Sequence, residues 1–191
     1  MMTVTTSWKT TIGSACVVVL LATGSVAEAL DSAAAEPPAI RLAGDDRAFI
    51  KQSAGAGIFE VEASKLAAQK AQSPEVRKFA QMLVRQHTAV NAQLKTLAED
   101  KSYTLPLEMP GAKRSTLASL SQSSGAAFDA AYLRQVGIKD HKTDIKHFET
   151  AARSAKDPDL KTWAGKTLPS LKEHLAAAES LESSVGIAHK P

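Results

Sequence analysis

Cysteine is nearly absent from this chain of 191 residues, which has only Cys16, inside an apolar run near the N-terminus. Downstream of that run no disulfide and no cysteine-based metal site can form, so a folded domain there must be stabilised by its core. A glycine-rich phosphate loop and a Ser-His-Asp arrangement are missing too. The sequence therefore excludes a disulfide scaffold and gives no signal for nucleotide binding or serine hydrolase chemistry.

A long membrane-spanning segment is also missing, because the apolar run of about residues 12–22 is too short for a comfortable span. This run follows Lys9 and precedes the small-residue triplet Ala27-Glu28-Ala29, which is the order of a secretory signal peptide. We therefore expect a signal peptide over residues 1–29 and no transmembrane span after its cleavage. The expected location is periplasmic or secreted.

A clustered basic face is the third absence. The formal net charge of +3 is spread along the chain, and removing the signal peptide takes away one lysine and one glutamate, which leaves the charge unchanged. Nucleic-acid binding requires basic side chains gathered on one face. We therefore expect no nucleic-acid partner.

Strand-like alternation is missing as well, and helical periodicity fills the part of the chain that follows residue 44. We expect an all-α fold: an antiparallel four-helix bundle with a long crossover between helices two and three that carries a short extra helix. An Ala/Pro-rich linker is expected over residues 30–44, the domain over residues 45–184 and a disordered tail over residues 185–191. The expected helices span about 45–72, 74–100, 112–120, 126–155 and 158–184.

Two of the expected helices begin in the same way. Ser73-Pro74 and Asp157-Pro158 each place an N-cap residue before a proline at the first helical position. The segments that start there, SPEVRKFA and DPDLKTWA, align position by position when Ser73 is matched to Asp157. This likeness indicates an internal duplication of a helical hairpin.

Histidine and glutamate occupy inward positions where a bundle usually has aliphatic side chains. Glu60 and His87 are almost equally distant along the chain from Ser73, and His141 and His174 are almost equally distant from Asp157. Each pair is therefore level across its antiparallel hairpin, and all four side chains are expected to converge near mid-bundle, whether the two turns lie at the same end or at opposite ends. The inward series are Phe49, Ser53, Ala56, Glu60, Ala63 and Ala67; Val76, Ala80, Leu83, His87, Val90, Leu94 and Leu97; Ala127, Ala131, Ile138, His141, Ile145, Phe148 and Ala152; and Leu160, Ala164, Thr167, Leu171, His174, Ala178 and Leu181.

Three imidazoles and a carboxylate suit a divalent first-row metal such as zinc, copper or iron. The competing interpretation is a buried histidine and carboxylate network that sets the register of the helices. Another histidine, His147, shares a helix face with Asp140 and Asp144, and we expect that face to be solvated. Phe79 and Trp163 hold equivalent positions in the two hairpins and are expected to pack in the core.

These residues resemble the bacterial secreted domain-of-unknown-function family 4142. The resemblance covers about residues 46–181 and is carried by Glu60, His87, Asp140-His141 and the segment from Leu168-Pro169 to His174. It implies a ferritin-like bundle and export, while the biochemical role of the family is not established.

Ferritin-like di-iron proteins place two Glu-x-x-His motifs in the core. Here Val84 and Leu171 stand at the positions that the glutamates of such motifs would hold before His87 and His174, so a ferritin-type di-iron oxidase is disfavoured. The leading hypothesis is a non-enzymatic exported bundle that binds a metal ion through the Glu60, His87, His141 and His174 cluster. The alternatives are a structural or stress-associated envelope bundle with a protein partner, and a mononuclear metalloenzyme with an open coordination position.

Overall fold

The computed structural model describes the backbone of residues 42–188 and the side chains of residues 42–184. The expected signal peptide, most of the expected linker and residues 189–191 lie outside this range. Within it every regular element is helical, which confirms the all-α prediction. The elements are α1 (Gly44–Lys70), α2 (Pro74–Asp100), α3 (Gly111–Gln122), α4 (Gly125–Tyr132), the π-helix η1 (Leu133–Asp140), α5 (His141–Ser154) and α6 (Pro158–Ala188).

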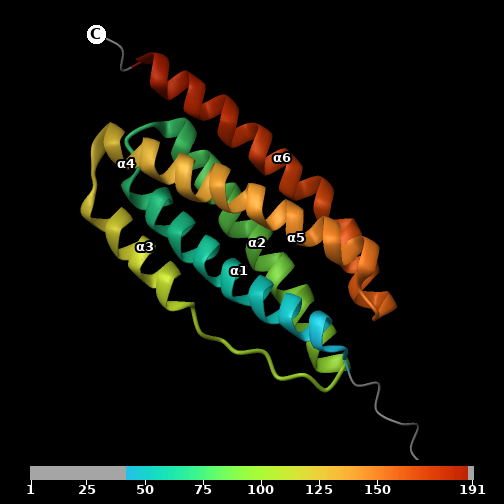
Figure 1. The fold of residues 1–191 in the computed structure, drawn as a ribbon. Coiled ribbons are helices and arrows are strands. Elements are labelled where there is room, and N and C mark those ends of the chain that lie inside the picture. The colour runs from blue at the N-terminus through green and yellow to red at the C-terminus, as the bar shows by residue number, and fades with distance from the viewer. Residues whose placement is uncertain (1–41, 189–191) are drawn as a thin grey trace, which may run out of the picture. The chain divides into compact units, whose positions relative to one another are not determined.

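The bundle consists of two antiparallel hairpins (Figure 1). α1 packs against α2, and α6 packs against the long helix formed by α4, η1 and α5. The crossover of residues 101–110 returns along the bundle to α3, which lies against α1. None of the described helices is long and apolar enough to cross a membrane. The long crossover with its short helix is where the sequence predicted it.

The two turns lie at opposite ends of the bundle, and each is held by an aspartate from the other hairpin. Asp129 in α4 accepts hydrogen bonds from the backbone N–H groups of Gln72 and Ser73 at 2.9 and 2.7 Å. Asp46 in α1 accepts from the backbone N–H groups of residues 156 and 157 at 3.1 and 2.9 Å. Buried carboxylates are costly unless they are paired in this way. The reciprocal contacts therefore fix the two hairpins against each other.

The predicted helix starts have the expected caps. Ser73 Oγ accepts from the N–H groups of Glu75 and Val76 at 3.2 and 3.3 Å. Asp157 Oδ1 accepts from the N–H groups of residues 159 and 160 at 3.0 and 2.9 Å. Leu42 is buried ahead of α1, and the backbone of α6 continues to Ala188.

The π-helix η1 changes the register of the third long helix. Asp46 and Asp129 play matching roles, since each caps the turn of the other hairpin. The chain from Asp129 to Asp157 is nevertheless one residue longer than the chain from Asp46 to Ser73. A π-helix bonds residue i to i+5 and so absorbs one extra residue. The inward series drawn with α-helical spacing was wrong at this end for that reason: Ala127 is exposed, and Phe128 is fully buried.

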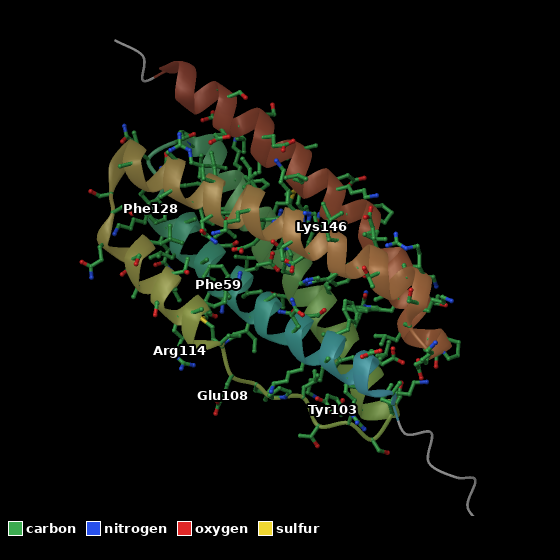
Figure 2. All side chains as sticks on the ribbon, viewed as in Figure 1. Phe59, Tyr103, Glu108, Arg114, Phe128 and Lys146 are labelled. Carbon is green, nitrogen blue, oxygen red and sulfur yellow. The ribbon has the colours of Figure 1, made fainter. Side chains whose placement is uncertain are left out.

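The core has two apolar halves with a polar layer between them. Figure 2 shows Phe59 and Phe128 among the side chains between the helices, in the half that also contains Leu83. The other half contains Leu94 and Trp163. Burial of Phe79 and Trp163 follows the prediction.

Candidate metal centre

Four inward polar side chains meet in the layer between the two apolar halves. Glu60, His87, His141 and His174 come from α1, α2, α5 and α6, and each is at most 3% exposed. The three histidines offer one ring nitrogen each such that all three nitrogens lie within 4.8 Å of one another. The structure thus brings together the four residues that the sequence predicted to lie at one level of the bundle.

Each imidazole has one ring nitrogen facing an acceptor of the protein. His141 Nδ1 donates to the carbonyl oxygen of Val136 at 2.8 Å. His174 Nε2 contacts the side-chain oxygen of Gln86. His87 Nδ1 lies 3.0 Å from Glu60 Oε2. A ring nitrogen that donates in this way leaves the other nitrogen with a free lone pair.

The remaining ring nitrogens are the ones left to bind a metal. His141 Nε2 lies 3.2 Å from His174 Nδ1. His87 Nε2 is buried and has no hydrogen-bond partner among the described residues. Ligands about 2.0–2.1 Å from a tetrahedral zinc ion lie about 3.3 Å apart, close to the separation of the first two nitrogens. The donor set suits an ion bound by three imidazoles, and the separation of the His141 and His174 nitrogens matches that of two ligands on one ion.

The sequence family described as a domain of unknown function (DUF4142) matches residues 31–181. This chain is a member of the DUF4142 family. No curated protein sequence matches it.

The bundle of this DUF4142 protein is similar to three solved structures. A DUF305 fragment from Deinococcus radiodurans has a TM-score of 0.67 at 11% identity, over 75% of this chain and 99% of the fragment. A DUF305 protein from Streptomyces coelicolor, described as secreted, has a TM-score of 0.63 at 15% identity, over 74% of this chain and 94% of its own. CopM in the Cu(II)-bound form has a TM-score of 0.62 at 17% identity, over 73% of this chain and 96% of its own. At these identities the likeness shows the helical fold, and the narrower ferritin-like description stays a prediction.

Glu60 of this DUF4142 protein contacts His87 at Nδ1, the ring nitrogen that is not left for a metal. Its Oε2 atom approaches His87 Nδ1, and its Oε1 atom lies 3.7 Å from His141 Nδ1, the nitrogen that already bonds Val136. Both oxygens therefore approach the outward ring nitrogens. A carboxylate in this position would orient His87 if that ring bound a metal, as outer partners of metal-bound histidines do.

The expectation of a solvated Asp140 and Asp144 face was wrong. Both carboxyl groups are buried, at 6% and 8% exposure: Asp140 pairs with Lys113 of α3, and Asp144 lines a small cavity with Glu60 of α1. Lys113 of α3 donates to Asp140 Oδ1 at 2.7 Å and lies over the ring of Phe59. The crossover helix thus supplies the cation that compensates this buried acid.

Burial governs the protonation of the cluster. It lowers the pKa of His87 to about 4 against a smaller opposing effect of Asp144. It lowers the pKa of His174 to about 3, with added repulsion from the other two histidines, and it also lowers the pKa of His141. All three rings are neutral at pH 7, which is the form that binds metal.

The same burial keeps the acids protonated to higher pH. It raises the pKa of Glu60, and it raises the pKa of Asp144 to about 8, with a further contribution from Glu60. One feature of the sequence does point to Asp144. When the two hairpins are aligned by matching Ser73 to Asp157, Glu60 is matched to Asp144. Under the expected duplication of the hairpin, Asp144 is the counterpart of Glu60, and both acids line the same small cavity.

The other histidines lie elsewhere. His147 contacts the side chain of Gln52, with Nδ1 at 2.6 Å from the amide nitrogen, and is separate from the three-histidine group. His189 lies outside the described residues.

Proposed function

We propose that this DUF4142 protein is an exported bundle that binds one divalent copper or zinc ion through His87, His141 and His174. Glu60, which the sequence predicted as a fourth ligand, instead orients His87 through its contact with Nδ1 of that ring. The observation that carries the proposal is the convergence of three ring nitrogens whose partner nitrogens are occupied by Val136, Gln86 and Glu60.

The donor set narrows the choice of metal. Three neutral imidazoles suit copper and zinc, whereas mononuclear iron sites of this size usually include a carboxylate ligand. The Cu(II)-bound form of CopM has the same helical fold, which supports copper as one of the two metals to test. The N-terminal signal pattern supports export, as does the secreted description of the Streptomyces coelicolor protein.

The competing interpretation is a metal-free histidine network. The 3.2 Å contact becomes an ordinary hydrogen bond if His174 carries its proton on Nδ1. In that tautomer, Nε2 of His174 must accept from Ser170 Oγ, 3.3 Å away, or from the amide group of Gln86. The two interpretations differ in metal content and can be separated directly.

The test is elemental analysis of the untagged protein, expressed with export and purified without chelator. We expect near-stoichiometric copper or zinc, lost in each of the variants His87→Gln, His141→Gln and His174→Gln. His147→Gln is the matched control, because it removes a histidine outside the cluster, and it should retain the metal. Circular dichroism of each variant shows whether it is folded.

Glu60→Gln separates ligand from orienting residue. We expect it to retain the metal stoichiometry with about 10–100-fold weaker affinity, the usual effect of losing an outer partner of a ligating histidine. Loss of stoichiometric binding in this variant would make Glu60 a ligand. A folded wild type with no metal, and only weak affinity for added copper or zinc, would leave the histidines as a structural network.

A further inference from the structure

A cavity of about 20 Å³ adjoins the polar layer on the side of Leu94 and Trp163. Its inner wall includes the buried side chains of Glu60, His87 and Trp163. This volume is enough for about one water molecule, provided that the walls supply polar partners. The cavity is therefore a place where one very small polar ligand fits.

The inner wall supplies those partners. Glu60 Oε1, His87 Nε2 and Trp163 Nε1 are buried and have no hydrogen-bond partner among residues 42–184. Buried polar atoms are rarely left unpaired, because the lost hydrogen bond to water is not replaced. The indole N–H is a donor and the carboxylate oxygen is an acceptor. A ligand bound between them must both accept and donate hydrogen bonds, or bind a cation held on His87.

The outer wall lies between α1 and α2. It is formed by the half-buried residues Ser53, Ala56 and Asn91, with Gly57 beneath them. A Cβ atom at Gly57 would lie 2.0 Å from Asn91 Oδ1, so glycine is required for the asparagine to pack here. Asn91 follows His87 by one helical turn and covers the cavity from the solvent side. Since Ser53, Ala56 and Asn91 are partly exposed, the cavity lies close to the solvent between α1 and α2.

We propose that this cavity is the site of an exogenous ligand that binds through a single water-sized atom, such as water, hydroxide or the terminal nitrogen of azide, and that reaches the bound metal beside His87 from the gap between α1 and α2. The inference rests on the proposed metal site and adds that the ion has an open coordination position with restricted access. An open position distinguishes sites that bind small reactants from closed structural sites. Larger ligands are excluded by the volume of the cavity.

The experiment uses the copper-loaded protein with sodium azide as the probe. Elemental analysis first establishes near-stoichiometric copper. Azide bound to Cu(II) is then followed by its charge-transfer absorption and by the electron paramagnetic resonance spectrum. We expect saturable azide binding, and no spectral change with imidazole at the same concentrations.

Two alanine-to-leucine variants on neighbouring helices provide the comparison. Ala56→Leu places a larger side chain in the cavity wall and should weaken azide binding about tenfold or more, with copper content unchanged. Ala92→Leu is the matched control, because Ala92 is exposed on α2 and does not line this cavity. It should bind azide as the wild type does.

The outcomes separate the two proposals. Near-stoichiometric copper without an azide response, or equal azide affinity in Ala56→Leu and the wild type, would overturn the open position and leave the metal site standing. A spectral response to imidazole equal to that of azide would overturn the size restriction. A wild type that holds neither copper nor zinc, and that binds added copper or zinc only weakly, would refute the metal site and this inference together.

Discussion

The metal-free protein should lose stability in acid because of the buried histidines, and His87 gives the size of the effect. Its pKa is about 4 in the folded protein against 6.5 for an exposed histidine, chiefly because of burial. Below pH 6.5 the unfolded chain therefore takes up a proton that the folded chain refuses until about pH 4. The free energy of unfolding falls through this window by about 1.4 kcal/mol per pH unit, or about 3 kcal/mol in all. That is a large share of a typical domain stability of about 5–15 kcal/mol.

Asp144 acts in the opposite direction. Its pKa is raised from 3.8 to about 8, so the folded protein holds a proton that the unfolded chain has released. Its contribution to stability therefore increases as the pH falls from about 8 towards 4. The wild type combines both effects, and variants are needed to separate them.

The assay is urea unfolding of chelator-treated protein, followed by circular dichroism at several pH values. Between about pH 6 and 4.5, His87→Gln should reduce the acid-induced loss of stability by about 1.4 kcal/mol per pH unit. Between about pH 7 and 4.5, Asp144→Asn should make the loss steeper by a similar amount. If both variants follow curves parallel to the wild type, the two side chains do not titrate as their burial requires and the reasoning is refuted.

Three further predictions concern packing, caps and metal. A Cβ atom at Gly137 would lie 2.6 Å from the Cβ atom of Ala178. Gly137 lies one helical turn from His141, and Ala178 lies one turn from His174. We therefore expect Gly137→Ala to destabilise the fold by about 1–3 kcal/mol and to weaken metal binding. Ala178→Gly in the same chain should restore part of the metal affinity, and an additive double mutant would argue against the contact. Asp46→Asn and Asp129→Asn should each cost about 1–3 kcal/mol in urea unfolding, since each weakens a buried carboxylate that caps the opposite turn. Zinc or copper at about 100 times Kd should stabilise the wild type by about 2.7 kcal/mol, and an unchanged melting temperature would count against the site.

The helices and the inward polar positions could be predicted because they depend on local rules. The cap-and-proline pairs at Ser73 and Asp157 start helices wherever they occur in suitable sequence, and they fixed both turns. Counting from these turns placed Glu60 and His87 at one level, since an α-helix rises by a constant amount per residue. The same counting held for His141 despite the π-helix, because η1 ends just before it.

The π-helix itself could not be read from the spacing. One extra residue in a helix leaves the pattern of apolar residues almost intact, while every side chain before it rotates about the axis. Ala127 was therefore taken as inward where Phe128 is buried. The aspartates at positions 140 and 144 were misplaced for a different reason, since their burial depends on side chains of α3 and α1 respectively, whose positions no local pattern specifies.

The sequence by itself determined the all-α class and the layer that gathers Glu60 with three histidines, because periodicity and helix rise act along a single chain segment. Only the tertiary structure decided which ring nitrogen of each histidine is free, and that both Glu60 oxygens approach the outward ring nitrogens of His87 and His141. These properties depend on acceptors from other helices or from a distorted turn, such as Gln86 beside His174 and the Val136 carbonyl beside His141. Contacts between side chains distant in sequence require the packed bundle, so no reading of residue order could supply them.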